Sequence, residues 1–191
     1  DGDSYVRIPN VSNYQGEDVV LIHRLYPKQN SAIFQALLLL DILRRIGARV
    51  TMVVPYLSYS RQDKTFLEGE SLSAQVLCKL LADAGVRKLV TIDCHFLKKE
   101  GGAEYCGLKI HNLSSNHLLV EQGRTKVGLE NLEVISPDQG ANYLISEFGG
   151  KSMRKVRGEY KKEGKEDGEE TERSVSTIER DFDVNGENIL I

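Results

Sequence analysis

Short apolar runs recur along the first half of the chain at intervals of about thirty residues, and they constrain the fold more than any other feature. The runs cover residues 19–22, 49–54 and 88–93. Between them lie two longer stretches with helical periodicity, residues 31–46 and 71–84. Alternating strands and helices are typical of right-handed βαβ units around a parallel sheet. The sequence therefore predicts an α/β fold with mainly parallel strands flanked by helices.

The same order of apolar strand, polar loop and helix begins again in the second half of the chain. Residues 132–135 form another apolar run, and the loop 136–141 leads into a helical stretch that ends at Phe148. Such a restart indicates a second α/β domain. We expect the first domain to cover residues 1–111 and the second to cover residues 112–191.

The composition is that of an ordinary globular protein and excludes several functional classes. Of the 191 residues, 40% are hydrophobic and 28% are charged, and the net charge of −3 argues against a generally basic nucleic-acid binder. No run approaches the roughly 20 apolar residues of a membrane span, and no charged-then-apolar leader is present. The three cysteines have no CxxC spacing and are odd in number, which indicates reduced thiols. We expect a cytoplasmic protein that binds neither nucleic acid nor membranes.

Both ends of the chain fall close to strand-like segments. Residues 5–8, close to the start of the chain, read as a strand, and residues 188–191 read as a buried strand at its end. An unpaired apolar strand end favours aggregation, so a natural terminus is rare there. We therefore interpret the chain as truncated at both ends, with an incomplete second domain.

Polar residues gather where the predicted parallel strands end, which is the edge of such a sheet where ligands bind. In the loop after the second strand, Arg61 has the geometry to bind phosphate and Gln62 to read an amide or a ring edge. Asp93, His95 and Asp138 follow later strands and could organise a metal ion or a proton. A hard cation such as Mg²⁺ would be bound mostly by carboxylates and phosphate oxygens.

Simpler explanations exist for each of these features. An Asp-x-His pair is more often structural than catalytic, and an Arg-Gln-Asp-Lys run is usually an exposed surface. The chain has neither a Walker A pattern nor a GxGxxG pattern, so the common nucleotide cradles are absent. The residues by themselves predict an α/β protein with a site for a polyanion and a metal at the strand ends.

Residues 151–173 differ in composition from the rest of the chain. They contain eight basic and seven acidic side chains and almost no apolar ones, so they can bury little surface and should form a mobile loop. One interpretation is a solvated surface loop. The other is a flap that closes over a phosphorylated ligand.

One stretch is specific enough to indicate a family. Residues 55–64 read PYLSYSRQDK and resemble the PYxxYxRQDK motif of ribose-phosphate pyrophosphokinases, and residues 1–8 resemble that family's FPDGE-type segment without its first two residues. The segments 70–74, 93–95 and 136–138 follow in the family's order and at its spacing. The resemblance covers nearly the whole chain and is to archaeal or bacterial members.

The resemblance implies two phosphoribosyltransferase-like domains, the first on the ATP side of the site. It implies transfer of the diphosphoryl group of ATP to O1 of ribose 5-phosphate with release of AMP, assisted by Mg²⁺. It also implies a homo-oligomer that is built from dimers and can form a hexamer. These are enzymes of nucleotide biosynthesis.

Roles for individual residues follow from the same resemblance. Arg61 and Gln62 would contact ATP, and Asp1 and Asp3 would reach the adenine of ATP bound to a neighbouring subunit. Asp3 stands where the family usually has Glu, and its shorter side chain weakens that assignment.

His95 would lie at the Mg²⁺–ATP site, and Asp138 near the metal and ribose 5-phosphate. The family's catalytic Lys-x-Arg pair on a mobile loop matches Lys155 and Arg157, slightly early and followed by a long charged insertion. Lys161, Lys162 and Lys165 fit by spacing but lack the arginine.

The family's ribose-5-phosphate loop should begin directly after Ile191. We therefore expect the chain as given to be inactive by itself. Two alternatives stay open: a non-catalytic regulatory subunit that associates with the synthetase, and a plain phosphoribosyltransferase. The second has no use for the motif at residues 55–64, so we rank it last.

Overall fold

The computed structural model describes residues 2–128, 132–157 and 175–191, which divide into two units. Unit 1 covers Asp1–Ser115 and unit 2 covers Asn116–Ile191, whereas the sequence predicts a boundary after residue 111. Each unit is described by itself. None of the helices in the described ranges is both long enough and apolar enough to cross a membrane.

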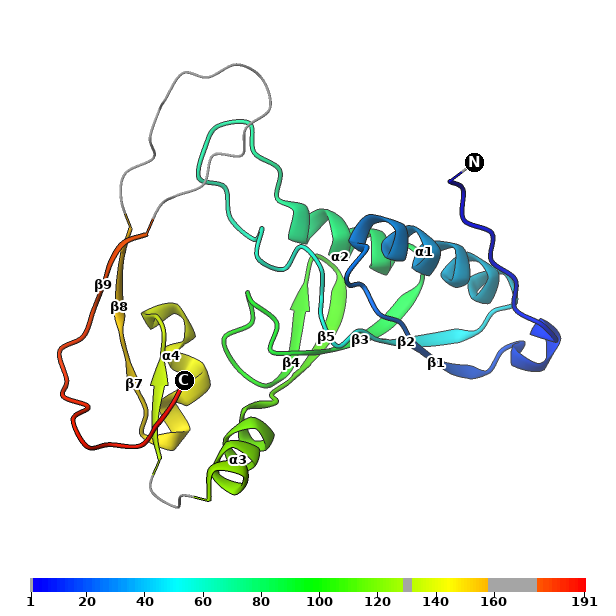
Figure 1. The fold of residues 1–191 in the computed structure, drawn as a ribbon. Coiled ribbons are helices and arrows are strands. Elements are labelled where there is room, and N and C mark those ends of the chain that lie inside the picture. Colours follow the sequence, from blue (N-terminus) through cyan, green and yellow to red (C-terminus); the bar gives the residue numbers. More distant parts are fainter. Residues whose placement is uncertain (1, 129–131, 158–174) are drawn as a thin grey trace. The chain divides into compact units, whose positions relative to one another are not determined.

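A five-stranded, mainly parallel sheet forms the centre of unit 1 (Figure 1). Its strand order is β1-β2-β3-β5-β4; the first four strands are parallel, and β4 runs antiparallel to β5. The strands are β1 (Asp18–Ile22), β2 (Arg49–Val53), β3 (Val86–Ile92), β4 (Gly101–Tyr105) and β5 (Leu108–Leu113). This arrangement confirms the predicted α/β class with a mainly parallel sheet flanked by helices.

The helices α1 (Gln29–Arg45) and α2 (Ser73–Asp83) lie on the same side of this sheet (Figure 1). A single core forms between these helices and the sheet, because every second residue of each strand faces them. Side chains at the centre of this core are fully buried: Ala36, Leu40, Met52, Leu81, Leu89 and Leu108. The close packing of this core fixes the strands whose ends carry the candidate site.

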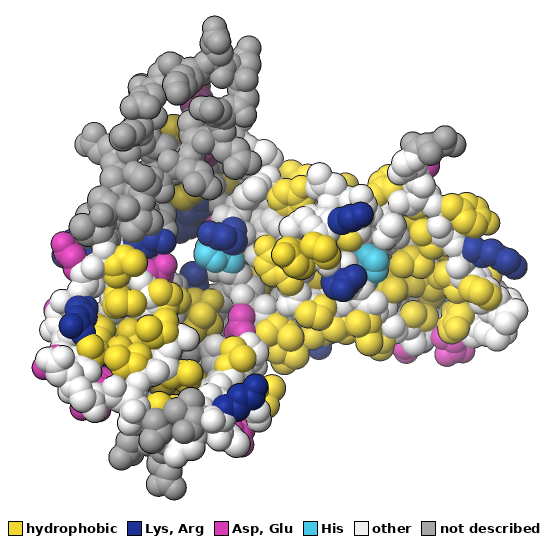
Figure 2. Space-filling view, in the orientation of Figure 1, with side chains coloured by type: hydrophobic (Ala, Val, Ile, Leu, Met, Phe, Trp, Pro, Cys, Tyr) yellow, Lys and Arg dark blue, Asp and Glu magenta, His cyan; other side chains and the backbone are white. Residues whose placement is uncertain are grey.

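Strand β1 is less buried than its run of apolar residues would indicate. It lies at the edge of the sheet, and Val20 and Ile22 are 64% and 73% exposed. Val19 and Leu21 point the other way and pack on the core. An apolar run predicts strand formation, but the side chains that stay exposed depend on which face the helices cover. Figure 2 shows such hydrophobic side chains on the surface of unit 1.

Two further features of unit 1 depart from the sequence predictions. Residues 5–8, expected as a strand, have no regular structure. Strand β4, which carries no clear apolar pattern, forms a hairpin with β5. Cys106 and Gly107 make its turn with φ angles of 52° and 81°. Strand β4 therefore forms through backbone pairing with β5, and the periodicity of its side chains does not predict it.

Unit 2 consists of short elements. Its helices and strands are α3 (Asn116–Val127), β6 (Glu133–Ser136), α4 (Asn142–Ile145), β7 (Lys151–Ser152), β8 (Arg154–Arg157), β9 (Val175–Glu179) and β10 (Ile189–Leu190), with 3₁₀ turns at Gln139–Ala141 and Ser146–Phe148. Strands β10, β6 and β7 form a parallel sheet, and β8 pairs with β9 in antiparallel fashion. In the described part of the unit the core is Val120, Val134 and Ile145.

The charged segment 151–173 is predicted as a mobile loop, and this is wrong for its first part. Residues 151–152 lie in β7 and residues 154–157 in β8, with Lys151 paired to Ile135 and Lys155 to Ile178. Strand pairing joins backbone groups and needs no apolar side chains, so charge-rich residues can still form strands. Residues 158–173 lie outside the described residues.

Candidate functional site

The loop after β2 is attached firmly to the loop after β1. The buried hydroxyl of Ser58 donates to the carbonyl oxygen of Leu25 at 2.6 Å, and the Tyr59 hydroxyl donates to the side-chain oxygen of Asn30. Tyr59 has a φ of 61°, a region that non-glycine residues rarely occupy. These contacts hold residues 57–60 against the core and leave the following Arg61 and Gln62 exposed at the surface.

A cavity of about 660 Å³ lies between these two loops. Arg61 and Gln62, both predicted from the sequence, lie in the wall formed by the loop after β2 together with Tyr56 and Tyr59. The other wall is formed by residues 28–31, at the start of α1, which carry no recognisable binding motif. The sequence does contain one signal for this wall: residues 28–31 follow a predicted parallel strand. Loops at the carboxyl ends of neighbouring parallel strands lie close together, so these residues could have been expected near Arg61.

Beyond Gln62 the same loop is stabilised by Glu70. One carboxylate oxygen of Glu70 accepts hydrogen bonds from the backbone N–H groups of Phe66 at 2.6 Å and Leu67 at 3.1 Å. These bonds favour the charged form and lower the pKa of the Glu70 carboxyl below its usual value. The loop therefore turns back on itself before α2 begins.

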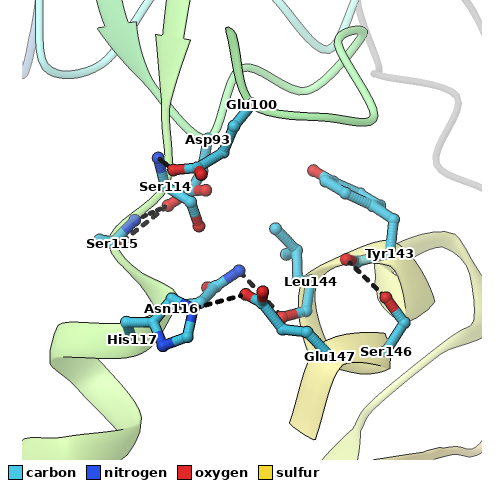
Figure 3. A network of polar contacts seen from close by, with 10 residues as sticks. All are labelled: Asp93, Glu100, Ser114, Ser115, Asn116, His117, Tyr143, Leu144, Ser146 and Glu147. Carbon is cyan, nitrogen blue, oxygen red and sulfur yellow. Dashed lines mark hydrogen bonds and ion pairs between the residues drawn. The ribbon is translucent and has the colours of Figure 1, made fainter.

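Asp93 serves the fold of unit 1 where β3 ends. Its Oδ2 accepts from both the backbone N–H of Ser115 at 3.1 Å and the Ser115 hydroxyl at 2.6 Å (Figure 3). The backbone of Asp93 has a φ of 44°, which aspartate tolerates better than most residues. These bonds connect the ends of β3 and β5. His95 follows two residues later and is exposed.

Asp138 lies two residues after the end of β6 in unit 2 and forms the N-cap of a 3₁₀ turn. Its Oδ1 accepts from the backbone N–H of Ala141 at 3.2 Å, and Ser136 donates its hydroxyl to the Asp138 carbonyl oxygen at 2.6 Å. A Cβ on Gly140 would lie 3.0 Å from Asp138 Oδ1, so this glycine leaves room for the carboxylate. The side chain is half-buried and held in one orientation.

Polar contacts also join α3 to the segment that follows Asp138. Asn116 donates its amide N–H to the carbonyl oxygen of Leu144 at 2.9 Å, and the His117 ring lies 3.2 Å from a Glu147 carboxylate oxygen (Figure 3). The first contact is partly buried and the second is exposed, and both supplement the small core of unit 2.

The remaining predicted residues lie in strands or near the start of the chain. Lys155 and Arg157 are two positions apart on β8, where they pair with Ile178 and Val175, and Lys155 is half-buried. Asp3 is exposed in an irregular segment, and Asp1 lies outside the described residues.

In the described ranges, no three His, Cys, Asp or Glu side chains come together as a group that could hold a metal. His95 belongs to unit 1 and Asp138 to unit 2. A Mg²⁺ ion bound by a carboxylate of either unit would need further oxygen atoms from a phosphorylated ligand, which is the usual arrangement for this ion.

Several known proteins that are similar to this chain are named for the same enzymatic activity. Residues 1–85 match the family described as the N-terminal domain of ribose phosphate pyrophosphokinase. A ribose-phosphate pyrophosphokinase of Sulfurisphaera tokodaii is 35% identical over 142 residues, which are 74% of this chain and 46% of that protein. Ribose-phosphate pyrophosphokinase 1 of Archaeoglobus fulgidus is 32% identical, over 82% of this chain and 55% of the relative.

A ribose-phosphate pyrophosphokinase of Methanopyrus kandleri aligns with all of this chain at 30% identity, over 62% of its own length. The chain spans about half the length of the curated relatives it matches.

The fold has a solved counterpart. The crystal structure of a phosphoribosylpyrophosphate synthetase from Mycobacterium smegmatis superimposes with a TM-score of 0.65 at 24% identity, over 80% of this chain and 52% of that one. At this identity the likeness shows the fold alone. Together with the sequence matches, it confirms the resemblance inferred from residues 55–64. The chain is therefore similar to the ribose-phosphate pyrophosphokinases, and its residues 1–85 match the N-terminal domain of that family.

Proposed function

We propose that the protein to which this chain belongs makes 5-phosphoribosyl 1-diphosphate from ATP and ribose 5-phosphate. The observation that carries the proposal is the motif at residues 55–64. Its buried part is bonded to the core, and its Arg61 and Gln62 lie exposed in the wall of a cavity at the strand ends. The names of the relatives support the same activity.

In the proposed reaction, O1 of the sugar attacks the β-phosphorus of ATP in line with the departing oxygen. The O1–phosphorus bond forms, the bond between the β-phosphorus and the α–β bridging oxygen breaks, AMP leaves, and the proton of the sugar hydroxyl passes to the solvent. Catalysis of such a transfer depends on positioning and on stabilising phosphate charge. Arg61 suits the second task because its guanidinium can bind a phosphate through two hydrogen bonds.

Mg²⁺ is part of this proposal and would reduce the charge of the phosphates when it is bound. Asp138 is a suitable carboxylate ligand, since Ala141 N–H orients its Oδ1. His95 would contact a phosphate or a metal-bound water, because Mg²⁺ prefers oxygen ligands. We also propose that Asp1 and Asp3 contact ATP on a neighbouring subunit, which requires a homo-oligomer, and that the protein acts in the cytoplasm.

The test of the activity is AMP formation from ATP and ribose 5-phosphate in the presence of Mg²⁺, with a chain extended beyond Ile191. AMP at the background level in the extended chain would refute the proposal. Replacing Arg61 by Ala should then lower AMP formation, while the exposed Lys79 of α2 provides a control substitution outside the cavity.

The regulatory-subunit alternative is favoured by one observation, the position of Lys155 within a strand pair, opposite Ile178, where the family has a mobile catalytic loop. If Lys155 and Arg157 are catalytic, Lys155→Ala should reduce turnover by orders of magnitude. The regulatory alternative instead predicts that Lys155→Ala changes little. Turnover of Lys155→Ala, measured beside Lys79→Ala, separates the two functions.

A further inference from the structure

The cavity of unit 1 has a second wall that the family motif does not include. Residues 28–31 form this wall at the start of α1, and Tyr56, Tyr59, Arg61 and Gln62 form the first. The bond from the Tyr59 hydroxyl to Asn30 joins the two walls directly. The site is therefore built by two loops together, so its ligand should contact both.

The charges on this cavity have a single sign. Of its eight lining residues, Lys28 and Arg61 are cations and none is acidic. The first turn of α1 also contains no acidic side chain, so the partial positive charge of its N-terminus adds to these cations. Such a cavity should favour an anionic ligand.

The size and the aromatic residues of the cavity indicate more than a free phosphate ion. A volume of about 660 Å³ lies in the range of pockets for nucleotide-sized ligands. Tyr56 and Tyr59 provide aromatic surface beside the cations, and bases stack favourably on such side chains. A molecule with a ring and a phosphate chain would use both kinds of surface.

We propose that Lys28 contacts the phosphates of the bound nucleotide, from the wall that does not contain Arg61. This inference rests on the proposed function, because it assigns a further binding residue to the same site. Lys28 is the N-cap residue of α1, and its side chain makes no capping hydrogen bond. Its ammonium can therefore be lost without removing a cap.

Calorimetric titration with ATP in the presence of EDTA tests the proposal, because the phosphates then meet only charges of the chain. For residues 1–191, Lys28→Ala should raise the Kd for ATP about three- to fivefold, the upper part of the range for the loss of one exposed ionic contact. Lys28→Arg should restore most of the affinity. Lys79→Ala removes a positive charge from α2 outside the cavity and should leave the Kd within about twofold.

Titration with adenosine and with inorganic phosphate identifies the part of the ligand involved. Lys28→Ala should leave adenosine affinity unchanged, since adenosine carries no phosphate. If Lys28→Ala weakens binding of inorganic phosphate but not of ATP, Lys28 belongs to a separate phosphate site and the inference is wrong. Equal thermal melting of Lys28→Ala and the wild type shows that folding is preserved; if this variant melts earlier, Lys28→Gln replaces it.

Failure of this inference can be told apart from failure of the proposed function. If Arg61→Ala weakens ATP binding and Lys28→Ala does not, Lys28 lies outside the nucleotide site and only this inference is overturned. If the wild-type chain binds no ATP, the proposed nucleotide site and the role of Lys28 are both overturned.

Discussion

Unit 1 and unit 2 both follow the α/β plan, but they are stabilised by different means. Unit 1 buries sixteen residues in one core, whereas the described part of unit 2 buries three, so hydrophobic burial contributes far more to the first. Unit 2 instead relies on backbone pairing of short strands and on polar contacts such as that of Asn116 with Leu144. The cavity with Arg61 and Lys28 therefore belongs to the well-packed unit 1, whereas Asp138 belongs to the weakly packed unit 2.

Core truncation should give the largest difference between the units. Leu89→Ala in unit 1 removes a fully buried side chain from a close-packed core and should lower the free energy of unfolding by about 2–5 kcal/mol. Val134→Ala in unit 2 should cost less, roughly 1–2 kcal/mol. Urea unfolding followed by circular dichroism measures both. Equal losses would contradict the difference in packing.

Overpacking provides a second test, located in unit 2. A Cβ on Gly150 would lie 2.7 Å from the carbonyl oxygen of Val134 and 2.9 Å from Ile145 Cδ1, so Gly150→Ala must shift the β6 backbone. We expect a loss of about 1–3 kcal/mol. Hydrogen exchange should then increase in β6 and α4 and stay unchanged in unit 1. Gly102→Ala is the matched control, because nothing lies within 4 Å of its added Cβ.

The role of Asp93 tests whether polar contacts also matter in the well-packed unit. Asp93→Ala removes the acceptor of both Ser115 hydrogen bonds and places alanine at a φ of 44°. The loss should be about 1–2 kcal/mol in urea unfolding. Asp93→Asn keeps one acceptor oxygen and tolerates this backbone, so it should lose less. If both variants are as stable as the wild type, the inference that Asp93 stabilises unit 1 is wrong.

The cysteines give the smallest effect and report on the packing of unit 1. Burial raises the pKa of the Cys78 thiol to about 12 and also raises the pKa of Cys94. At pH 8 iodoacetamide should therefore label the half-buried Cys106 before Cys78 or Cys94, as measured by peptide mass spectrometry. Labelling of Cys78 as fast as Cys106 would show that the core opens readily.

The raised pKa of Cys78 also predicts the direction of a pH effect. The unfolded thiol ionises near pH 9, whereas the folded one stays protonated up to about pH 12. The unfolded state therefore binds fewer protons in this interval, so stability should decrease as the pH rises from 9 to 12. Cys78→Ala should reduce this alkaline dependence.

Much of unit 1 could be predicted because its signals are local. The apolar runs at residues 49–54 and 88–93 and the helical periodicity of residues 31–46 need no knowledge of distant contacts. Strand β4 could not be found in this way, because its partner β5 creates it. The placement of Arg61 and Gln62 at a strand end also followed from sequence order, since loops after parallel strands share one edge.

Sequence order and the motif at residues 55–64 by themselves determined the fold class and the family that this chain resembles, because both depend on short stretches of neighbouring residues. Only the tertiary structure decided that Lys28 shares a cavity with Arg61, that Asp93 bonds to Ser115 and that β1 is an exposed edge. The physical reason is the same in each case. These features depend on contacts between residues more than twenty positions apart, which strand pairing and core packing create together.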